Sequence, residues 1–380
     1  MNKKSTILTI LANVCRCLLA VTFLFSGFVK ANDPLGTLYK LQDYLAAWGM
    51  DFIPKTILLF IAIAIALFEF SIGCNLALGR KRKQTSRITL CFMSVMTILT
   101  VYIAIYNPVT DCGCFGDAIV LTNTQTLLKN IVLLAAAIII SIYPLSIKRL
   151  ISPRIDWIVV SILMGGILIY SVYSIYALPS IDFRPYKIGT NLADAISGNG
   201  ESQMQFDVKI VYEKDGKRIE LGLEDDDPDS TWTYVETKRT PINNGLKPII
   251  NLYIENDGED ITSDIITDKG DVLMLIAPIL SEADQSTIDE INEIYEYLAP
   301  QEEVELYMLT ASNLAEQEKW IDYTGAEYII YTSDERILKT IVRANPGLIR
   351  LHDGVITHKW SSWNLPSVEK LKEIMKAQKK

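Results

Sequence analysis

Residues 115–380 contain no cysteine, since all six cysteines of the chain lie at or before Cys114. The chain also has only two histidines, His352 and His358. A structural zinc site needs four ligands, and a catalytic one needs three and a water molecule. Two histidines with no cysteine nearby fall short of both, so we interpret them as surface or edge residues and expect no metal.

Charge is also scarce: 21% of the residues are charged and 49% are hydrophobic, with a mean hydropathy of +0.22. This is too apolar for one soluble domain, and it predicts that part of the chain lies in a lipid bilayer. Residues 1–180 carry a net charge of +8 and residues 181–380 one of −17, which together give the total of −9. An acidic second half makes nucleic acid a poor partner, because phosphate contacts need clustered Lys and Arg.

Five apolar windows are long enough to cross a membrane. They cover residues 7–29, 54–78, 88–106, 126–143 and 155–178. The first window ends in FSGFVK and a polar-aromatic loop. A cleaved signal peptide would instead have a shorter apolar region and a small-residue cleavage site. We therefore expect a membrane anchor and five spans.

The basic residues of the short connections predict the orientation. Lys and Arg gather at residues 3–4, 80–87 and 148–154, whereas the loops 30–53 and 107–125 carry few basic residues and five aspartates. Basic loops face the cytoplasm. We therefore expect a multi-pass protein of the bacterial inner membrane, with a cytoplasmic N-terminus and a periplasmic C-terminal domain.

The tail has an α/β pattern. Residues 206–223 form two alternating runs around a KDGK turn, which predicts a hairpin. The acidic run EDDDPDS after it is interpreted as a solvated turn rather than an ion site. From Asp271 the expected order is a strand over 271–279, a helix over 282–298, a strand over 303–310, a helix over 313–322, a strand over 326–333 and a helix over 334–344. A hairpin turning at Asp353-Gly354 and a basic helix from Pro366 follow.

This order resembles a thioredoxin-like domain. The strand DVLMLIAPI, the Asn345-Pro346-Gly347 corner and the HDG hairpin carry the resemblance, which implies a cis-proline at Pro346. The lead-in NLYIENDGEDIT is similar to that of peroxiredoxin and TlpA-type members. The family's CxxC would follow the first core strand, where this chain has ILSEADQ. Thiol exchange needs a thiolate, so we expect the tail to bind or dock a client.

The first half contains three distinctive phrases, FLFSGFVKANDPLGTLYKLQDYL, FEFSIGCNLALG and DCGCFGD. They resemble the DoxX and MauE family of redox-associated membrane proteins. The whole chain is similar to a Bacteroidetes-type form of that family, fused to a degenerate thioredoxin-like domain. The resemblance implies a four-helix membrane domain over residues 1–150, with an added fifth transmembrane helix over 151–180. The remaining divisions are a hairpin and linker region over 181–270 and the thioredoxin-like domain lacking CxxC over 271–380.

Two charged residues lie inside the predicted spans. Arg16 comes nine residues after Ile7, and Glu69 comes nine residues before Leu78, so both are expected about 13 Å from the cytoplasmic end. A lone charge at such depth is costly, which predicts that Arg16 and Glu69 face each other. The pair is either a salt bridge that fixes the helix register or a site for a proton or a quinone headgroup.

Cys112 and Cys114 lie in an outward loop, whereas Cys15, Cys17, Cys74 and Cys91 are expected to pack within the spans. The Cys-Gly-Cys motif is interpreted as a labile disulfide for exchange, with an inert disulfide or a soft-metal site as alternatives. The nearby Asp111 and Asp117 are expected to disfavour a thiolate.

Two functions follow. In the first, Cys112 and Cys114 are the catalytic pair of a membrane thiol-disulfide relay that exchanges with a periplasmic thiol protein. A Cys114→Ala variant, which leaves Cys112 free, should then trap a mixed disulfide. A bound quinone is possible, but the chain lacks the second outward cysteine pair of related relays. The alternative is a membrane-anchored receptor or assembly factor, without enzyme activity, whose thioredoxin-like domain binds a client.

Overall fold

The computed structural model describes residues 3–50, 52–109, 111–197, 206–214, 217–222, 233–241, 250, 252–266, 270–301 and 304–378. The chain forms two compact units. The first comprises Met1–Arg184, Val342–Gly347 and Trp360–Pro366; the second comprises Pro185–Ile341, Leu348–Lys359 and Ser367–Lys380.

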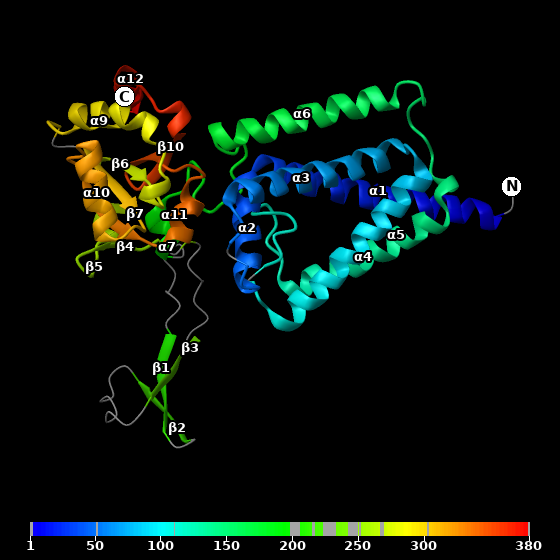
Figure 1. Ribbon diagram of the computed structural model, residues 1–380, viewed down its shortest axis with the longest axis horizontal. Helices are drawn as coiled ribbons and strands as arrows, with labels where there is room; N and C mark the ends of the chain where they lie inside the picture. The colour runs from blue at the N-terminus through cyan, green and yellow to red at the C-terminus, as the bar shows by residue number, and fades with distance from the viewer. Residues whose placement is uncertain are drawn as a thin grey trace. The chain divides into compact units, whose positions relative to one another are not determined.

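Five of the described helices are long and apolar enough to cross a membrane, which confirms the five predicted windows. They are α1 (Lys3–Asn32), α3 (Lys55–Leu78), α4 (Arg82–Tyr106), α5 (Asn123–Ile142) and α6 (Asp156–Ala177), shown in Figure 1. The chain is therefore a multi-pass membrane protein. Its outer helix surfaces carry many exposed large apolar side chains, as expected for surfaces in contact with lipid.

Helices α1, α3, α4 and α5 form a four-helix core, and α6 packs on α1 and α3. Buried Leu19, Phe23, Leu76, Met93 and Ile140 meet at its centre. Gly27 and Gly73 let α1 and α3 approach closely. A Cβ atom added at Gly27 would lie 2.6 Å from the Phe70 nitrogen, and one added at Gly73 would lie 2.7 Å from the Leu24 nitrogen. Small residues of this kind are typical of helix contacts within membranes.

A further helix, α2 (Pro34–Ala47), lies where the sequence analysis expected only a polar-aromatic loop. Asp33 caps it: the Gly36 nitrogen donates a hydrogen bond to Asp33 Oδ1 over 2.8 Å, and Pro34 occupies the first helical position. At 14 residues the helix is too short to span a bilayer. It connects α1 to α3 and buries Leu38.

The second unit contains two sheets. A three-stranded sheet has the order β2-β1-β3, formed by β1 (Phe206–Lys214), β2 (Lys217–Gly222) and β3 (Thr233–Pro241). Pairing of Lys214 with Lys217 confirms the predicted hairpin. The strand β3, which also pairs with β1, was not predicted. The acidic run EDDDPDS lies outside the described residues.

The larger sheet has seven strands in the order β10-β9-β6-β7-β8-β4-β5. They are β4 (Ile254–Asn256), β5 (Glu259–Asp260), β6 (Asp271–Ile276), β7 (Val304–Thr310), β8 (Ile329–Ser333), β9 (Gly347–His352) and β10 (Val355–Ser361). Strands β6, β7 and β8 are parallel, whereas β4 is antiparallel to both β8 and β5. Every residue of β6 is buried.

The helices that connect these strands complete a thioredoxin-like fold. They are α9 (Ile288–Leu298), α10 (Leu314–Thr324), α11 (Glu335–Ile341) and α12 (Val368–Gln378), with the short α7 (Leu192–Ser197) and α8 (Thr262–Ile266) before them. The observed β-α-β-α-β order, followed by a hairpin and a last helix, is the predicted one. Asp353 and Gly354 both have positive φ, at 48° and 75°, as a two-residue hairpin turn requires. The Asn345-Pro346 peptide bond is cis.

A candidate dithiol site

The Cys-Gly-Cys motif lies in the loop between α4 and α5, outside the membrane-spanning helices. Cys112 Sγ and Cys114 Sγ lie 2.7 Å apart, and both cysteines are free thiols. Gly113 between them has a φ of +67°, a conformation that residues with a side chain rarely adopt. Its nitrogen donates a hydrogen bond to Asp111 Oδ2 over 3.0 Å. The loop therefore depends on glycine to bring the two thiols together.

Helix α2 holds one side of this loop. Lys40 Nζ lies 2.5 Å from Asp111 Oδ1, and a Cβ atom at Gly113 would lie 3.1 Å from Lys40 Cγ. The Tyr44 hydroxyl donates a hydrogen bond to the Cys112 carbonyl over 3.0 Å. Burial raises the pKa of Tyr44, so Tyr44 remains a neutral donor. The unpredicted helix is thus part of the site.

Three buried polar side chains of α1 and α3 hold the backbone of the motif. Lys30 Nζ donates hydrogen bonds to the Cys114 carbonyl over 2.7 Å, to Ser26 Oγ over 2.7 Å and to Glu69 Oε2 over 2.8 Å. Ser26 Oγ lies 2.6 Å from the same carbonyl and 2.7 Å from Glu69 Oε2. Lys30, Ser26 and Glu69 are 7%, 6% and 4% exposed. We call these three residues the buried network.

The structure does not bring Arg16 and Glu69 together, so the predicted pair is wrong. Glu69 pairs with Lys30, whereas Arg16 Nη1 donates a hydrogen bond to the Lys148 carbonyl over 2.6 Å. The reason is the antiparallel register of α1 and α3, in which Leu24 lies against Gly73. This register places Arg16 about level with Lys81, well beyond Glu69. Ile7 and Leu78 were taken to be level with each other, but this register places Leu78 about level with Leu19.

The two thiols have unequal acidity. The pKa of Cys114 falls from 9.0 to about 6, mainly because Cys112 donates a hydrogen bond to it. Burial opposes this shift, and the charges of Lys129 and Lys30 add to it. The pKa of Cys112 is raised by that same hydrogen bond and by burial. These shifts favour the thiolate on Cys114, with Cys112 as the hydrogen-bond donor.

This result corrects the expectation that neighbouring acidic residues would disfavour a thiolate. Asp111 is paired with Lys40, which offsets its charge. Lys129, whose Nζ lies 4.2 Å from the centroid of the Phe115 ring, contributes a positive charge that favours the Cys114 thiolate. Asp117 itself has its pKa raised, chiefly by burial.

The first unit also contains the segment Val342–Gly347. Within this unit the Arg343 side chain lies between two carboxylates, with Nε 2.9 Å from Asp33 Oδ2 and Nη2 3.0 Å from Asp117 Oδ2. Its guanidinium carbon lies 5.3 Å from the centroid of the Tyr39 ring. This contact was not predicted, because no local sequence pattern relates Arg343 to Asp33 or Asp117.

The remaining cysteines and histidines form no comparable cluster. Cys15 and Cys74 are buried, whereas Cys17 and Cys91 are exposed on the helix surfaces. His352 Nδ1 lies 2.9 Å from Oδ1 of the buried Asp271, so this histidine is not simply an edge residue. No group of three or more potential metal-ligating His, Cys, Asp or Glu residues occurs among the residues that the structure describes.

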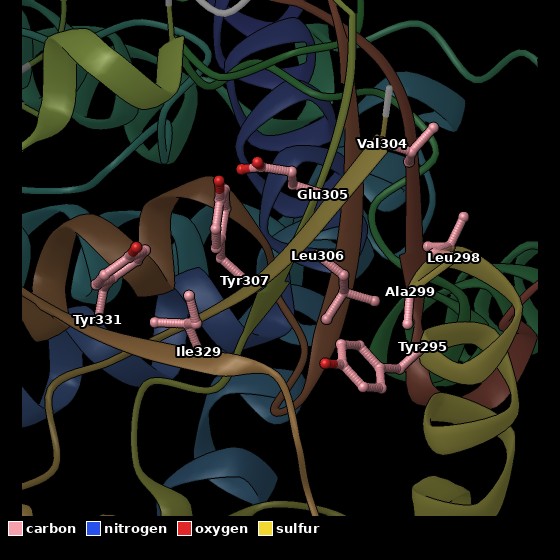
Figure 2. Close-up of a pocket in the computed structure, with 9 residues that line it drawn as sticks. All are labelled: Tyr295, Leu298, Ala299, Val304, Glu305, Leu306, Tyr307, Ile329 and Tyr331. Carbon is pink, nitrogen blue, oxygen red and sulfur yellow. The ribbon is translucent and has the colours of Figure 1, made fainter. Parts of the chain in front are cut away.

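A second candidate site is a cavity of about 240 Å³ in the second unit, between α9 and the strands β7 and β8. Figure 2 shows Tyr307 and Tyr331 side by side on neighbouring strands, with their ring centroids 5.2 Å apart. Tyr295 projects from α9 toward Leu306 in the same view. The cavity offers aromatic and aliphatic surface to a ligand, but no cysteine.

A comparison with family models identifies the membrane part of the chain. The model of the methylamine utilisation protein MauE matches residues 8–143, which include the CGC loop and the buried network. Residues 8–143 form a MauE-family membrane domain. A model of a domain of unknown function (DUF8463) matches residues 206–244, which include β1, β2 and β3.

Comparisons with whole proteins add little to the MauE-family assignment. Among curated proteins, none matches the chain. The chain is similar to a solution structure of a Bacteroides thetaiotaomicron protein whose assignment as a protein disulfide isomerase is provisional. That likeness has a TM-score of 0.26 and 11% identity, and it covers 34% of this chain and 83% of that chain. The thioredoxin-like assignment rests on the strand order described above.

Proposed function

We propose that the chain exchanges disulfides with a thiol protein through Cys112 and Cys114 of its MauE-family domain. The observation that carries the proposal is the pair of free thiols whose sulfur atoms lie 2.7 Å apart, in a loop outside the membrane spans. The lowered pKa of Cys114 supports it. A low thiol pKa is typical of reactive cysteines, whereas structural cysteines are inert. Cys114 is also the more accessible of the two, since Cys112 is only 9% exposed.

The exchange needs only the two partners. In the reducing direction, the Cys114 thiolate attacks one sulfur of a client disulfide and releases the other client sulfur as a thiolate. The Cys112 thiol gives its proton to that thiolate and then attacks Cys114 Sγ. This attack releases the second client sulfur as a thiolate, which takes a proton from water. Two electrons pass to the client, and a Cys112–Cys114 disulfide remains. A client dithiol reverses each step.

The proposed location is the periplasmic face of a bacterial inner membrane. Arg80 and Arg149 lie in the loops at the end of the bundle opposite to the CGC loop, and Arg82 begins α4 at the same end. Because basic loops face the cytoplasm, the CGC loop would face the compartment where disulfides form and persist. This orientation is part of the proposal. The proposed exchange does not require a bound quinone.

The test is to trap the mixed disulfide with the full chain in cells. Cys112→Ser leaves the accessible thiolate of Cys114 without its resolving thiol, so this variant should accumulate an adduct that disappears on reduction. Cys114→Ser leaves only the buried, less acidic Cys112 and should trap little. The assignment is the reverse of the one expected from sequence. Cys91→Ser, which removes an exposed cysteine of α4, is the matched control and should behave as the wild type.

An adduct-free Cys112→Ser variant, together with wild-type growth under thiol stress, would contradict the exchange function. The receptor function would then take its place, and the tyrosine-lined cavity favours it. In that case Tyr331→Ala should lower client binding, while a variant lacking both Cys112 and Cys114 should bind as the wild type does.

A further inference from the structure

Lys30 lies in the last turn of α1, where a long basic side chain could extend toward water at the membrane surface. Instead its side chain is only 8% exposed. All three hydrogens of its ammonium group have an acceptor: Ser26 Oγ, Glu69 Oε2 and the Cys114 carbonyl. This arrangement connects the charge of Lys30 directly to the backbone of the more acidic thiol.

Burying two charges is expensive, and apolar side chains of similar size would join α1 and α3 at lower cost. Gly27 and Gly73 already bring these helices into close contact. The ion pair is therefore not needed to hold the helices together. Its distinctive property is its position next to Cys114.

We propose that the Lys30–Glu69 pair sets the reactivity of Cys114. In this arrangement Lys30 is a positioning residue that holds the Cys114 carbonyl and favours the thiolate, and Glu69 limits that effect. The proposal rests on the proposed function for its biological meaning, but it concerns a property of the thiol that is measurable without any client.

The two members of the pair should act with opposite sign. A positive charge near a thiol favours the thiolate, whereas a negative charge disfavours it. The charge of Lys30 lowers the pKa of Cys114 and the charge of Glu69 raises it. A pair with a purely structural role would respond differently, because loss of either partner would disturb the loop in the same way.

Ser26 provides a matched control. Its hydroxyl contacts the same two oxygens, the Cys114 carbonyl and Glu69 Oε2, but carries no charge. Ser26→Ala therefore removes the hydrogen bond that the hydroxyl donates and the one that it accepts from Lys30, and leaves both charges in place. Lys30→Arg keeps the positive charge while changing the shape of the side chain.

The experiment measures the pH dependence of Cys114 alkylation in the full-length protein, purified in detergent, with Cys112→Ser as the background. Mass spectrometry of the peptide that contains residue 114 separates this thiol from the other cysteines. Lys30→Gln should move the midpoint of the profile to higher pH. Below the midpoint it should slow alkylation about twofold, since half a pKa unit lowers the thiolate fraction about threefold and raises the nucleophilicity of the thiolate about 1.7-fold. Glu69→Gln should move the midpoint to lower pH.

Three further variants keep the result interpretable. The double variant Lys30→Gln, Glu69→Gln should return the midpoint close to that of the background, even if one single variant folds poorly. Lys30→Arg should lie near the background, and so should Ser26→Ala. The proposal would be overturned if the midpoints of Lys30→Gln and Glu69→Gln shifted in the same direction. It would also be overturned if neither single variant shifted the midpoint.

The outcomes separate this proposal from the exchange function. If the midpoints shift with opposite sign but Cys112→Ser traps no client, the buried network tunes the thiol and the exchange function is wrong. If a client is trapped but the midpoints do not respond to either charge, the exchange function holds and the role of the Lys30–Glu69 pair is wrong.

Discussion

The unequal acidity of the two thiols predicts a specific pH profile for Cys114. Its pKa of about 6 depends chiefly on the hydrogen bond from Cys112. Cys112→Ser retains a donor in the form of a hydroxyl, whereas Cys112→Ala removes it. We therefore expect an alkylation midpoint near pH 6 for Cys112→Ser and a clearly higher midpoint for Cys112→Ala.

The magnitude determines which measurement is informative. With a pKa of about 6, roughly nine tenths of Cys114 is thiolate at pH 7, compared with roughly one hundredth for a thiol at the reference value of 9.0. A less basic thiolate is also a weaker nucleophile, by roughly 15- to 30-fold over three pKa units for a Brønsted coefficient of about 0.4–0.5. The two effects leave a rate advantage of only about three- to sixfold at pH 7. A rate at one pH is thus a poor test, and the midpoint is a good one.

The assay is a series of alkylation rates between pH 4.5 and about 10 with a membrane-impermeant reagent, read from the peptide that contains residue 114. A midpoint near 9 for Cys112→Ser, or equal midpoints for Cys112→Ser and Cys112→Ala, would refute the reasoning. The hydrogen bond between the thiols would then have no role in their acidity.

Three other outcomes follow from the structure. Tyr44→Phe removes the hydroxyl that donates to the Cys112 carbonyl, and we expect it to cost about 1 kcal/mol in thermal or denaturant unfolding, with the spans intact. Gly113→Ala introduces a side chain at a φ of +67° and 3.1 Å from Lys40 Cγ. It should therefore destabilise the loop by about 1 kcal/mol or more and slow alkylation of Cys114. An unchanged alkylation rate would contradict the role of Gly113. A reporter that is active only in the cytoplasm, fused after Lys380, should be silent, and an active reporter would contradict the five-span orientation.

The sequence predicted the five spans because each apolar window is long enough to be recognised without tertiary information. It did not predict α2, whose 14 residues lie between two spans and resemble a loop in composition. A local signal was present, however. Asp33 followed by Pro34 is a typical N-cap and first helical position, and the structure uses them in this way.

In the tail, the sequence located the strands and the last hairpin but not the start of a helix. Short runs rich in apolar residues located the strands β6, β7 and β8, and the Asp353-Gly354 turn located the last hairpin. The helix expected over 282–298 begins only at Ile288, because two short 3-10 turns precede it and Asp284 accepts a hydrogen bond from the Ser286 nitrogen. Element ends depend on such single contacts, which a periodic pattern does not contain.

The partner of Glu69 was missed for a different reason. Depth was measured from the edges of the apolar windows, and Lys30 lies just past the first window, so it was treated as part of a loop. In the structure α1 continues to Asn32, which brings Lys30 inside the bundle. Composition alone therefore does not show whether a charged side chain at the end of an apolar window is exposed to water.

The cluster around Cys114 is built entirely from the MauE-family domain. Each of the three phrases that resembled the DoxX and MauE family contributes one part of the cluster. FLFSGFVK supplies Ser26 and Lys30, FEFSIGC supplies Glu69, and DCGC supplies the two thiols. Segments far apart in the sequence thus meet at one buried network beneath a dithiol. The thioredoxin-like domain contributes no cysteine, so any thiol exchange by this chain must start in the membrane domain.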